Sequence, residues 1–204
     1  MIKAILFDLG NVLVDFDYSI AARRIAHFCG VSHKEIPSIL LDSNITSLFE
    51  EGKILPEDFF LRLKDLLGLR VSYKVFVPIW NEVFFLSAKN RSVYSLANRL
   101  RDKYTIAVLS NINILHYEYL KKHFPIFGIF HAVFASCNMG LVKPDVKIYV
   151  KALEALGVSP QEAFYTDDRQ ELVKGAQALI INSFVFKNAK KLKDDLIGSG
   201  VVLS

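Results

Sequence analysis

The sequence predicts an α/β fold, with a central parallel sheet covered by helices on both faces and a small helical unit inserted after the first strand. Two observations predict it. Short apolar runs recur at wide intervals with helical patterns between them, and one early stretch, 18–88, carries helical patterns alone. Alternating strands and helices are typical of a parallel sheet between two helical layers.

Five runs have the features of strands that are buried on both faces. Each is short, mostly apolar without alternation, and bounded by polar or turn residues. The expected strands are 2–7, 105–110, 131–136, 162–167 and 182–187.

Helical periodicity fills the intervals between the later strands. The expected helices are 91–103, 113–124, 146–157 and 170–179. Each strand–helix–strand connection should be a right-handed crossover.

The stretch 18–88 predicts three or four amphipathic helices and no strand. They are expected within 18–30, 33–44, 56–68 and 73–85. Because strand 2–7 must join the later sheet, this stretch is an insertion. We therefore expect a core of 1–17 and 89–204 and a helical unit, 18–88, over the carboxyl ends of the strands, where open α/β sheets bind ligands.

Composition limits the classes of partner. With 52% apolar and 23% charged residues, the 204-residue chain should form a compact fold. The net charge is +4, but the dense basic cluster 187–193 is followed by Asp194 and Asp195, which favours a solvated helix face over a nucleic-acid site. We expect no nucleic-acid partner.

Cysteine usage and hydropathy predict a soluble, cytoplasmic protein. Cys29 and Cys137 lie far apart without a CxxC companion, and free thiols suit a reducing compartment. The apolar run before Asp8 is too short for a signal peptide, and no stretch approaches the roughly 20 apolar residues of a membrane span. The five histidines show no metal-ligand spacing. The oligomeric state stays open.

Polar residues stand at the ends of the expected strands or, for Lys143, in the loop after strand 131–136. They are Asp8, Ser110, Asn111, Lys143, Asp167 and Asp168. Each alone has an ordinary structural explanation, such as a helix cap or an exposed turn. Because the carboxyl ends of parallel strands share one edge, we expect the whole set to converge on one site.

This set of groups suits phosphoryl transfer through an aspartyl intermediate. Carboxylates hold Mg²⁺, which prefers oxygen ligands. An Asp carboxyl, with an unperturbed pKa of about 3.9, is ionised at neutral pH and can attack phosphorus. A hydroxyl, N–H groups and a lysine then stabilise the charge on the transferred group.

Four motifs resemble those of the haloacid dehalogenase superfamily of phosphatases, in order along essentially the whole chain. They are "FDLGNV" (7–12), "VLSN" (108–111), "KPD" (143–145) and "YTDD" (165–168). The stretch 18–88 resembles the family's helical cap of the first type, including "FEEGKILPEDFFLRL" at 49–63. The resemblance implies a Rossmann-like three-layer sandwich, and "DLGNV" resembles the branch of epoxide hydrolase phosphatase domains and bacterial sugar-phosphate phosphatases.

The resemblance also implies roles for individual residues. It makes Asp8 the nucleophile and a Mg²⁺ ligand, with Gly10 as a ligand through its carbonyl and Asp168 as a further ligand beside Asp167.

The remaining motif residues correspond to the family's phosphate site. Ser110 and the Asn111 N–H would hold the phosphate, and Lys143 would neutralise it and orient Asp8.

Two positions depart from the family pattern. The family's second acid, which protonates the leaving group and activates water, is replaced by Gly10, and such acid–base help is typically worth about 10²–10⁴ in rate. Asp15 or Asp17 could reach back, although hinge positions suit them better. The family's Gly after the helix at 170–179 is replaced by Ile180 or Ile181.

Three functions remain open. The first is a Mg²⁺-dependent phosphatase for a small phosphorylated metabolite, a sugar phosphate being one candidate. The second is a metal-independent 2-haloacid dehalogenase, and the third is a weakly catalytic binding or regulatory protein. Adjacent acids at Asp167 and Asp168 would repel each other without a cation, which favours the phosphatase.

Aromatic side chains of the helical unit are candidates for lining a substrate pocket, although such residues at helical spacing more often form a core. They are Tyr18, Phe59, Phe60, Trp80, Phe84 and Phe85.

Overall fold

A computed structural model describes residues 1–203 and contains, within them, one five-stranded parallel sheet of order β5-β4-β1-β6-β7. The strands are β1 (Ala4–Phe7), β4 (Thr105–Ser110), β5 (Ala132–Ala135), β6 (Ala163–Asp167) and β7 (Asn182–Val185). Every expected strand is present, and the first is central. The predicted Rossmann-like α/β fold is confirmed.

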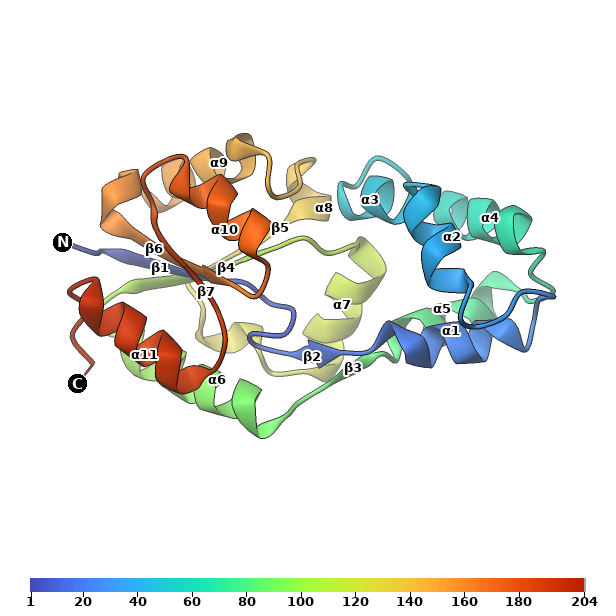
Figure 1. Ribbon diagram of the computed structural model, residues 1–204, viewed down its shortest axis with the longest axis horizontal. Coiled ribbons are helices and arrows are strands. Elements are labelled where there is room, and N and C mark those ends of the chain that lie inside the picture. The colour runs from blue at the N-terminus through green and yellow to red at the C-terminus, as the bar shows by residue number, and fades with distance from the viewer. Residues whose placement is uncertain (204) are drawn as a thin grey trace.

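Helices cover both faces of this sheet (Figure 1). One layer holds α6 (Ala88–Leu100) and α11 (Ala189–Gly198), and the other holds α9 (Val146–Leu156) and α10 (Gln170–Gln177). Alternate residues of β1 enter different clusters, Ile5 and Phe7 the first and Ala4 and Leu6 the second. The strand is therefore apolar without alternation because both faces are buried.

Short helices lie among these elements. They are α7 (Ile114–His123), α8 (Ser136–Met139) and the 3₁₀ turns η1 (Phe127–Ile129) and η2 (Pro160–Glu162). The expected helix around the basic cluster is α11, whose lysines are exposed while Leu192 and Leu196 are buried. In the described part of the chain, no helix combines the length and hydropathy needed to cross a membrane.

A second hydrophobic cluster belongs to the helices of residues 18–81. These helices are α1 (Tyr18–Ala26), α2 (Ile36–Asp42), α3 (Ile45–Glu50), α4 (Pro56–Leu67) and α5 (Tyr73–Asn81). Three or four helices were expected and these residues form five, because α3 lies outside every expected range and follows α2 directly. The break is at Asn44, which adopts a left-handed conformation with φ of 54°.

The expectation of no strand within 18–88 is wrong. β3 (Phe84–Phe85) pairs antiparallel with β2 (Asp15–Phe16), so the two chain segments that join the sheet to the helices run side by side (Figure 1). The helix expected to continue to residue 85 ends at Asn81. Two residues carry no periodic signal, and their partner lies far away in the sequence.

Candidate active site

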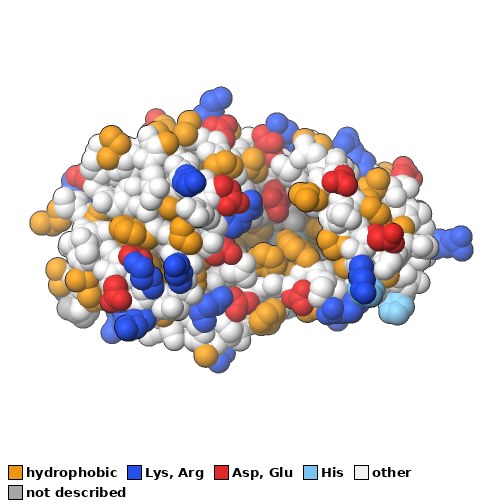
Figure 2. All heavy atoms as spheres, viewed as in Figure 1, with side chains coloured by type: hydrophobic (Ala, Val, Ile, Leu, Met, Phe, Trp, Pro, Cys, Tyr) orange, Lys and Arg blue, Asp and Glu red, His pale blue; other side chains and the backbone are white. Residues whose placement is uncertain are grey.

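The ends of three neighbouring strands bring the predicted residues together. β1 lies between β4 and β6, so Asp8, which follows β1, stands between Ser110 at the end of β4 and Asp167 at the end of β6. A cavity of about 180 Å³, the phosphate cavity, opens there. Its lining includes Asp8, Gly10, Ser110, Asn111, Lys143 and Asp168. Figure 2 shows this face hollowed between the sheet and the helices of 18–81, with acidic, basic and hydrophobic side chains around the hollow.

Lys143 connects the acids at the centre of this group. Its buried Nζ donates to Asp8 Oδ1 at 2.7 Å and to Asp167 Oδ2 at 2.6 Å, and it lies 3.0 Å from the Leu109 carbonyl oxygen. The Asn111 side chain fixes the Lys143 backbone, since its Oδ1 accepts from Lys143 N at 2.8 Å and its Nδ2 donates to Lys143 O at 2.9 Å. Lys143 is therefore held in place at both ends.

Burial and charge act against each other in this cluster. Burial raises the pKa of Asp8 to about 7, with Lys143 opposing the rise and Asp167 adding to it. Burial alone would lower the pKa of Lys143, but the two carboxylates outweigh it and raise this pKa. The lysine thus keeps its positive charge next to Asp8.

The two adjacent acids have different surroundings. Asp167 is fully buried, and both of its oxygens are engaged, Oδ2 by Lys143 and the Tyr165 hydroxyl and Oδ1 by Arg169 N at 2.9 Å. Asp168 faces the phosphate cavity, and its Oδ2 accepts from Asn11 Nδ2 at 2.8 Å. Burial raises the pKa of Asp168.

The donor set fits a divalent cation. One oxygen each from Asp8, Asp167 and Asp168 lies within 4.8 Å of the others, and carboxylate oxygens are the ligands that Mg²⁺ prefers. Asp8 and Asp168 face the phosphate cavity, while Asp167 is already hydrogen-bonded through both oxygens. The acids outnumber the one lysine among them, so a cation would relieve their mutual repulsion.

The position of the missing second acid is sterically closed. A Cβ atom added at Gly10 would lie 2.8 Å from Cε1 of Phe16 and 3.9 Å from Asp8 Oδ2. Phe16 is itself packed against Tyr18, with ring centroids 5.0 Å apart. The ring of Phe16 thus fills the space beside Asp8 that a longer side chain would need.

Asp15 and Asp17 are not among the described residues that line the phosphate cavity. Asp15 is ion-paired with Lys89 Nζ at 2.6 Å and accepts from Asn90 Nδ2 at 3.1 Å. Asp17 caps α1 by accepting from Ser19 N at 2.8 Å. Both serve the connection between sheet and helices.

Sequence reasoning missed several residues that line the phosphate cavity. They are Asn11, Glu50, His116 and Arg169. Asn11 adopts a positive φ of 56°, which Asn tolerates better than most residues, so the "LGN" turn carried a signal. Glu50 stood only within the cap stretch 49–63 and His116 gave no signal, because both reach the cavity through the packing of α3 and α7.

His116 is neutral and fully hydrogen-bonded. Asn113 Nδ2 donates to its Nδ1 at 2.9 Å, which leaves Nε2–H to donate to the Trp80 carbonyl at 3.0 Å. Burial lowers its pKa to about 4. His116, which belongs to α7, therefore contacts α5 through the Trp80 carbonyl.

The aromatic candidates divide between core and cavity. Phe59 and Phe60 are buried in the cluster of the helical unit, and Phe85 is exposed. Tyr18 and Phe84 line the phosphate cavity, and Trp80 lines a neighbouring one together with Tyr18.

Comparisons with known proteins agree with this geometry. The chain is 27% identical to a sesquiterpene phosphatase of Aspergillus oryzae, over 87% of the chain and 86% of the relative. It is 25% identical to a D-ribitol-5-phosphate phosphatase of Bacteroides thetaiotaomicron, over 96% and 97%. A crystal structure of a HAD family enzyme of Bacteroides thetaiotaomicron, in complex with magnesium and inorganic phosphate, superposes with a TM-score of 0.81 at 28% identity and covers 92% of this chain and 96% of that one.

The family model for hydrolases of the haloacid dehalogenase type matches residues 2–179, which is well over half of the sequence. This match spans Asp8, Ser110 and Asp168 at the strand ends and Lys143 in the loop between α8 and α9. The chain therefore belongs to the haloacid dehalogenase-like hydrolase family.

Proposed function

We propose that the protein is a Mg²⁺-dependent phosphatase that hydrolyses a small phosphorylated metabolite through an aspartyl-phosphate on Asp8. The observation that carries the proposal is the position of the Asp8 carboxylate. It faces the phosphate cavity beside Asp168, and its Oδ1 accepts a hydrogen bond from Lys143 Nζ at 2.7 Å. The phosphatase relatives and the magnesium and phosphate bound by the similar enzyme support it.

The residues around Asp8 divide the chemistry. Asp8, the Gly10 carbonyl and Asp168, with Asp167 beside them, would hold Mg²⁺, whose charge offsets the repulsion between the substrate phosphate and the carboxylates.

Asp8 attacks phosphorus, and its own oxygen takes the place of the leaving alcohol. Lys143 fixes the attacking carboxylate and shares the negative charge of the transferred group. The Ser110 hydroxyl and the Asn111 N–H bind the phosphate oxygens. Water then releases inorganic phosphate and restores Asp8.

The organisation of the chain suits this chemistry. We assign the catalytic core to 1–17 and 89–204 and a cap to 18–88, joined by the β2–β3 pair. Three cap residues, Tyr18, Glu50 and Phe84, line the same cavity as Asp8, so the cap shields the reacting group from bulk water. The ribitol phosphate relative keeps sugar phosphates among the candidate substrates.

Turnover of p-nitrophenyl phosphate with and without Mg²⁺ tests the proposal. Asp8→Asn should abolish turnover, because an amide is no nucleophile. Asp17→Asn is the matched control, since Asp17 caps α1 and Asn caps a helix equally well. Turnover retained by Asp8→Asn would contradict the mechanism.

Two further outcomes distinguish the other functions. Metal-independent chloride release from 2-chloropropionate, without phosphatase activity, would indicate a dehalogenase. Inactivity on both substrates, in a folded protein that binds Mg²⁺, would indicate a binding protein.

A further inference from the structure

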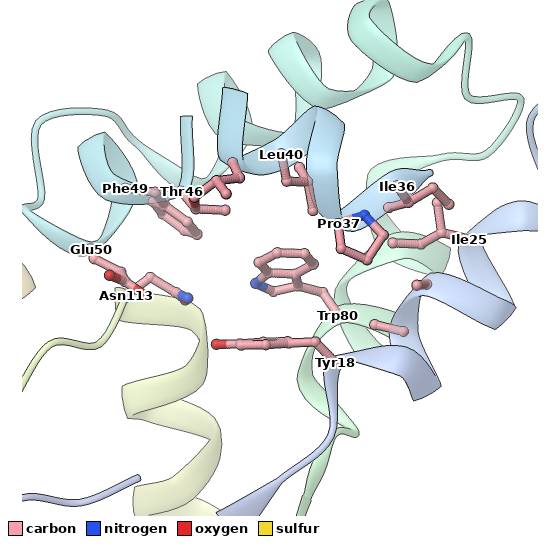
Figure 3. A pocket seen from close by; sticks show the side chains of 13 residues that line it. Tyr18, Ile25, Ile36, Pro37, Leu40, Thr46, Phe49, Glu50, Trp80 and Asn113 are labelled. Atoms are coloured by element: carbon pink, nitrogen blue, oxygen red, sulfur yellow. The ribbon is translucent and has the colours of Figure 1, made fainter. Parts of the chain in front are cut away.

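A second cavity, of about 210 Å³, adjoins the phosphate cavity and is called the apolar cavity here. Its walls are mainly hydrophobic side chains of the cap helices, including Ile25, Ile36, Leu40, Phe49 and Trp80 (Figure 3). Tyr18 and Glu50 line both cavities, so the two cavities adjoin each other at these side chains. The apolar cavity is thus the neighbouring space for the organic group of a ligand whose phosphate is held at Asp8.

Polar groups of the apolar cavity gather toward the phosphate cavity. Figure 3 shows Glu50 and Asn113 together at one end, with Ile25 and Ile36 at the other. The indole nitrogen of Trp80 is turned toward the polar end, and within residues 1–203 it has no hydrogen-bond partner. A buried indole N–H usually has an acceptor, so this nitrogen is an unsatisfied donor beside the polar end of the cavity.

We propose that the apolar cavity binds the organic group of the substrate, and that the substrate is a phosphate monoester of an apolar alcohol, such as an alkyl or prenyl phosphate. This inference rests on the proposed phosphatase activity and gives it a substrate class. A sugar in the same place would lose water from its hydroxyls and meet mainly hydrocarbon in return. The apolar class therefore replaces sugar phosphates as the favoured candidate.

A homologous series of esters tests the substrate class. From ethyl to hexyl phosphate, kcat/KM should rise about three- to fourfold per methylene until the cavity is full. Ribitol 5-phosphate and glucose 6-phosphate should fall at least about 100-fold below hexyl phosphate. Sugar phosphates turned over as well as hexyl phosphate, or no rise along the series, would overturn the inference.

A cavity-filling variant makes the test specific. Leu40→Trp should abolish the preference for hexyl over ethyl phosphate, because Leu40 lines the apolar cavity. Leu61→Trp is the control, since Leu61 is exposed on another cap helix. A preference that survives Leu40→Trp unchanged would overturn the inference.

Failure of the two proposals can be told apart. Mg²⁺-dependent turnover of p-nitrophenyl phosphate, lost in Asp8→Asn, establishes the activity independently of the apolar series. Without that turnover the proposed function fails and takes the substrate class with it. With that turnover and no apolar preference, the substrate class alone fails.

A different observation carries a second inference, which concerns the missing acid at Gly10. Glu50 ends α3 and lines both cavities, so its side chain lies where the phosphate meets the organic group. A substrate with its phosphate in the phosphate cavity and its organic group in the apolar cavity would place the bridging ester oxygen at this junction. No other Asp or Glu of the described chain lines both cavities.

The end of α3 is fixed against the core. The Glu50 carbonyl accepts a hydrogen bond from Ser136 Oγ at 2.6 Å. Two residues on, a Cβ at Gly52 would lie 2.3 Å from the Cys137 carbonyl oxygen, so the backbone there rests directly on α8. Glu50 is thus held in place relative to the strand ends.

The surroundings of Glu50 suit proton exchange near neutral pH. Burial raises its pKa to about 7, opposed by the positive charges of Arg169 and Lys143. The other titratable groups on the walls of the two cavities are Asp8, Tyr18, His116 and Asp168. A carboxyl group with a pKa near the working pH can both donate and accept a proton.

We infer that Glu50 is the catalytic acid and base in place of the missing residue. As Asp8 forms its bond to phosphorus, the bond from phosphorus to the ester oxygen breaks, and the Glu50 carboxyl protonates that oxygen to release the alcohol. The Glu50 carboxylate then takes a proton from the water that attacks the aspartyl-phosphate. Inorganic phosphate leaves, and Asp8 and protonated Glu50 are restored.

Leaving-group dependence tests this role, which also rests on the proposed phosphatase activity. The rate of phosphoenzyme formation can be measured by rapid quench. In Glu50→Gln this rate should fall about 10²–10⁴-fold with butyl phosphate. With p-nitrophenyl phosphate, whose leaving group needs little protonation, it should fall by less than about tenfold. Glu51→Gln is the control, because Glu51 pairs with Lys53 at 2.8 Å and does not line either cavity.

Two results would overturn the role of Glu50. One is an unchanged rate with butyl phosphate in Glu50→Gln, and the other is an equal loss with both esters. In either case wild-type turnover of p-nitrophenyl phosphate still decides the proposed function separately.

Discussion

The ring of Phe16 fills the space beside the Asp8 carboxylate that a side chain at position 10 would need. The absence of the family's second acid therefore involves two residues: Gly10 has no side chain, and Phe16 occupies the space that one would need. Phe16 also contacts Phe84, with ring centroids 6.2 Å apart, so turning the Phe16 ring away would lose this packing as well as its contact with Tyr18. Restoring the acid alone should not restore the family arrangement.

Gly10→Asp should lower the free energy of unfolding by about 1–3 kcal/mol through overpacking against Phe16, without raising phosphatase turnover. Denaturant unfolding and p-nitrophenyl phosphate turnover measure the two effects. Gly10→Ala separates overpacking from the added charge, and Gly10→Asp with Phe16→Ala should recover part of the stability. A faster and equally stable Gly10→Asp protein would contradict this account.

Individual residues differ in how far the sequence could predict them. Asp8, Ser110 and Lys143 were expected at one site because strand ends of a parallel sheet share an edge. The turn after α10 was expected to depart from the family pattern, because Ile180 or Ile181 replaces a Gly. Ile180 adopts a φ of 64°, which is an unfavourable conformation for a β-branched residue. Glu50 was not predicted as a site residue, since only tertiary packing places α3 against the strand ends.

At the scale of elements, the local sequence pattern predicted the helices and strands that have a periodic or apolar signal and missed those that depend on long-range contacts. The five sheet strands and the helices on both faces follow from apolar runs and helical spacing. β2 and β3 have two residues each. They form only because the segments that enter and leave the cap pair with each other. The docking of α3 on α8 is likewise a long-range contact, through Glu50 and Ser136.

Gly52→Ala tests whether this docking places α3. Gly52 has a φ of 73°, and a Cβ would also lie 2.3 Å from the Cys137 carbonyl oxygen, so strain and overpacking should each lower stability by about 1–3 kcal/mol. Turnover of alkyl phosphates should fall because Glu50 is displaced. Unfolding and kcat/KM for butyl phosphate measure the two effects.

Gly68→Ala is the matched control for that experiment. Gly68 has a similar φ of 64°, but nothing lies within 4 Å of an added Cβ. The difference between the two variants therefore isolates the contact with Cys137. Equal losses of stability and activity in both variants would contradict the docking role of Gly52.

At the scale of the whole molecule, His116 ties the core to the cap. It extends from α7 to the Trp80 carbonyl on α5, and its ring stacks on Trp80 at 5.3 Å and on Tyr18 at 5.8 Å. A protonated ring would lose the acceptor nitrogen that Asn113 needs and would place a charge in a buried site. Joining of cap and core should therefore depend on pH.

The sign of this dependence follows from the direction of the pKa shift. The pKa of His116 is about 4 in the folded protein and 6.5 for an unperturbed histidine, so only the unfolded chain binds the proton between these values. The contribution of His116 to stability is complete above pH of about 6.5 and is lost as the pH falls toward 4, by up to about 3 kcal/mol. Asp8 and Glu50 act in the opposite direction, because burial raises their pKa values to about 7 and stability from them is lost as the pH rises toward 7.

Comparing the wild type with His116→Gln cancels the contributions of Asp8 and Glu50, because both proteins contain these two residues. Gln does not titrate and keeps an amide donor and an acceptor, so the difference in free energy of unfolding between the two proteins should shrink as the pH falls from 7 to 4.5. Denaturant unfolding across this range measures it, and His33→Asn, at an exposed position, should follow the wild type. A difference that stays constant with pH would show that His116 does not couple protonation to the joining of cap and core.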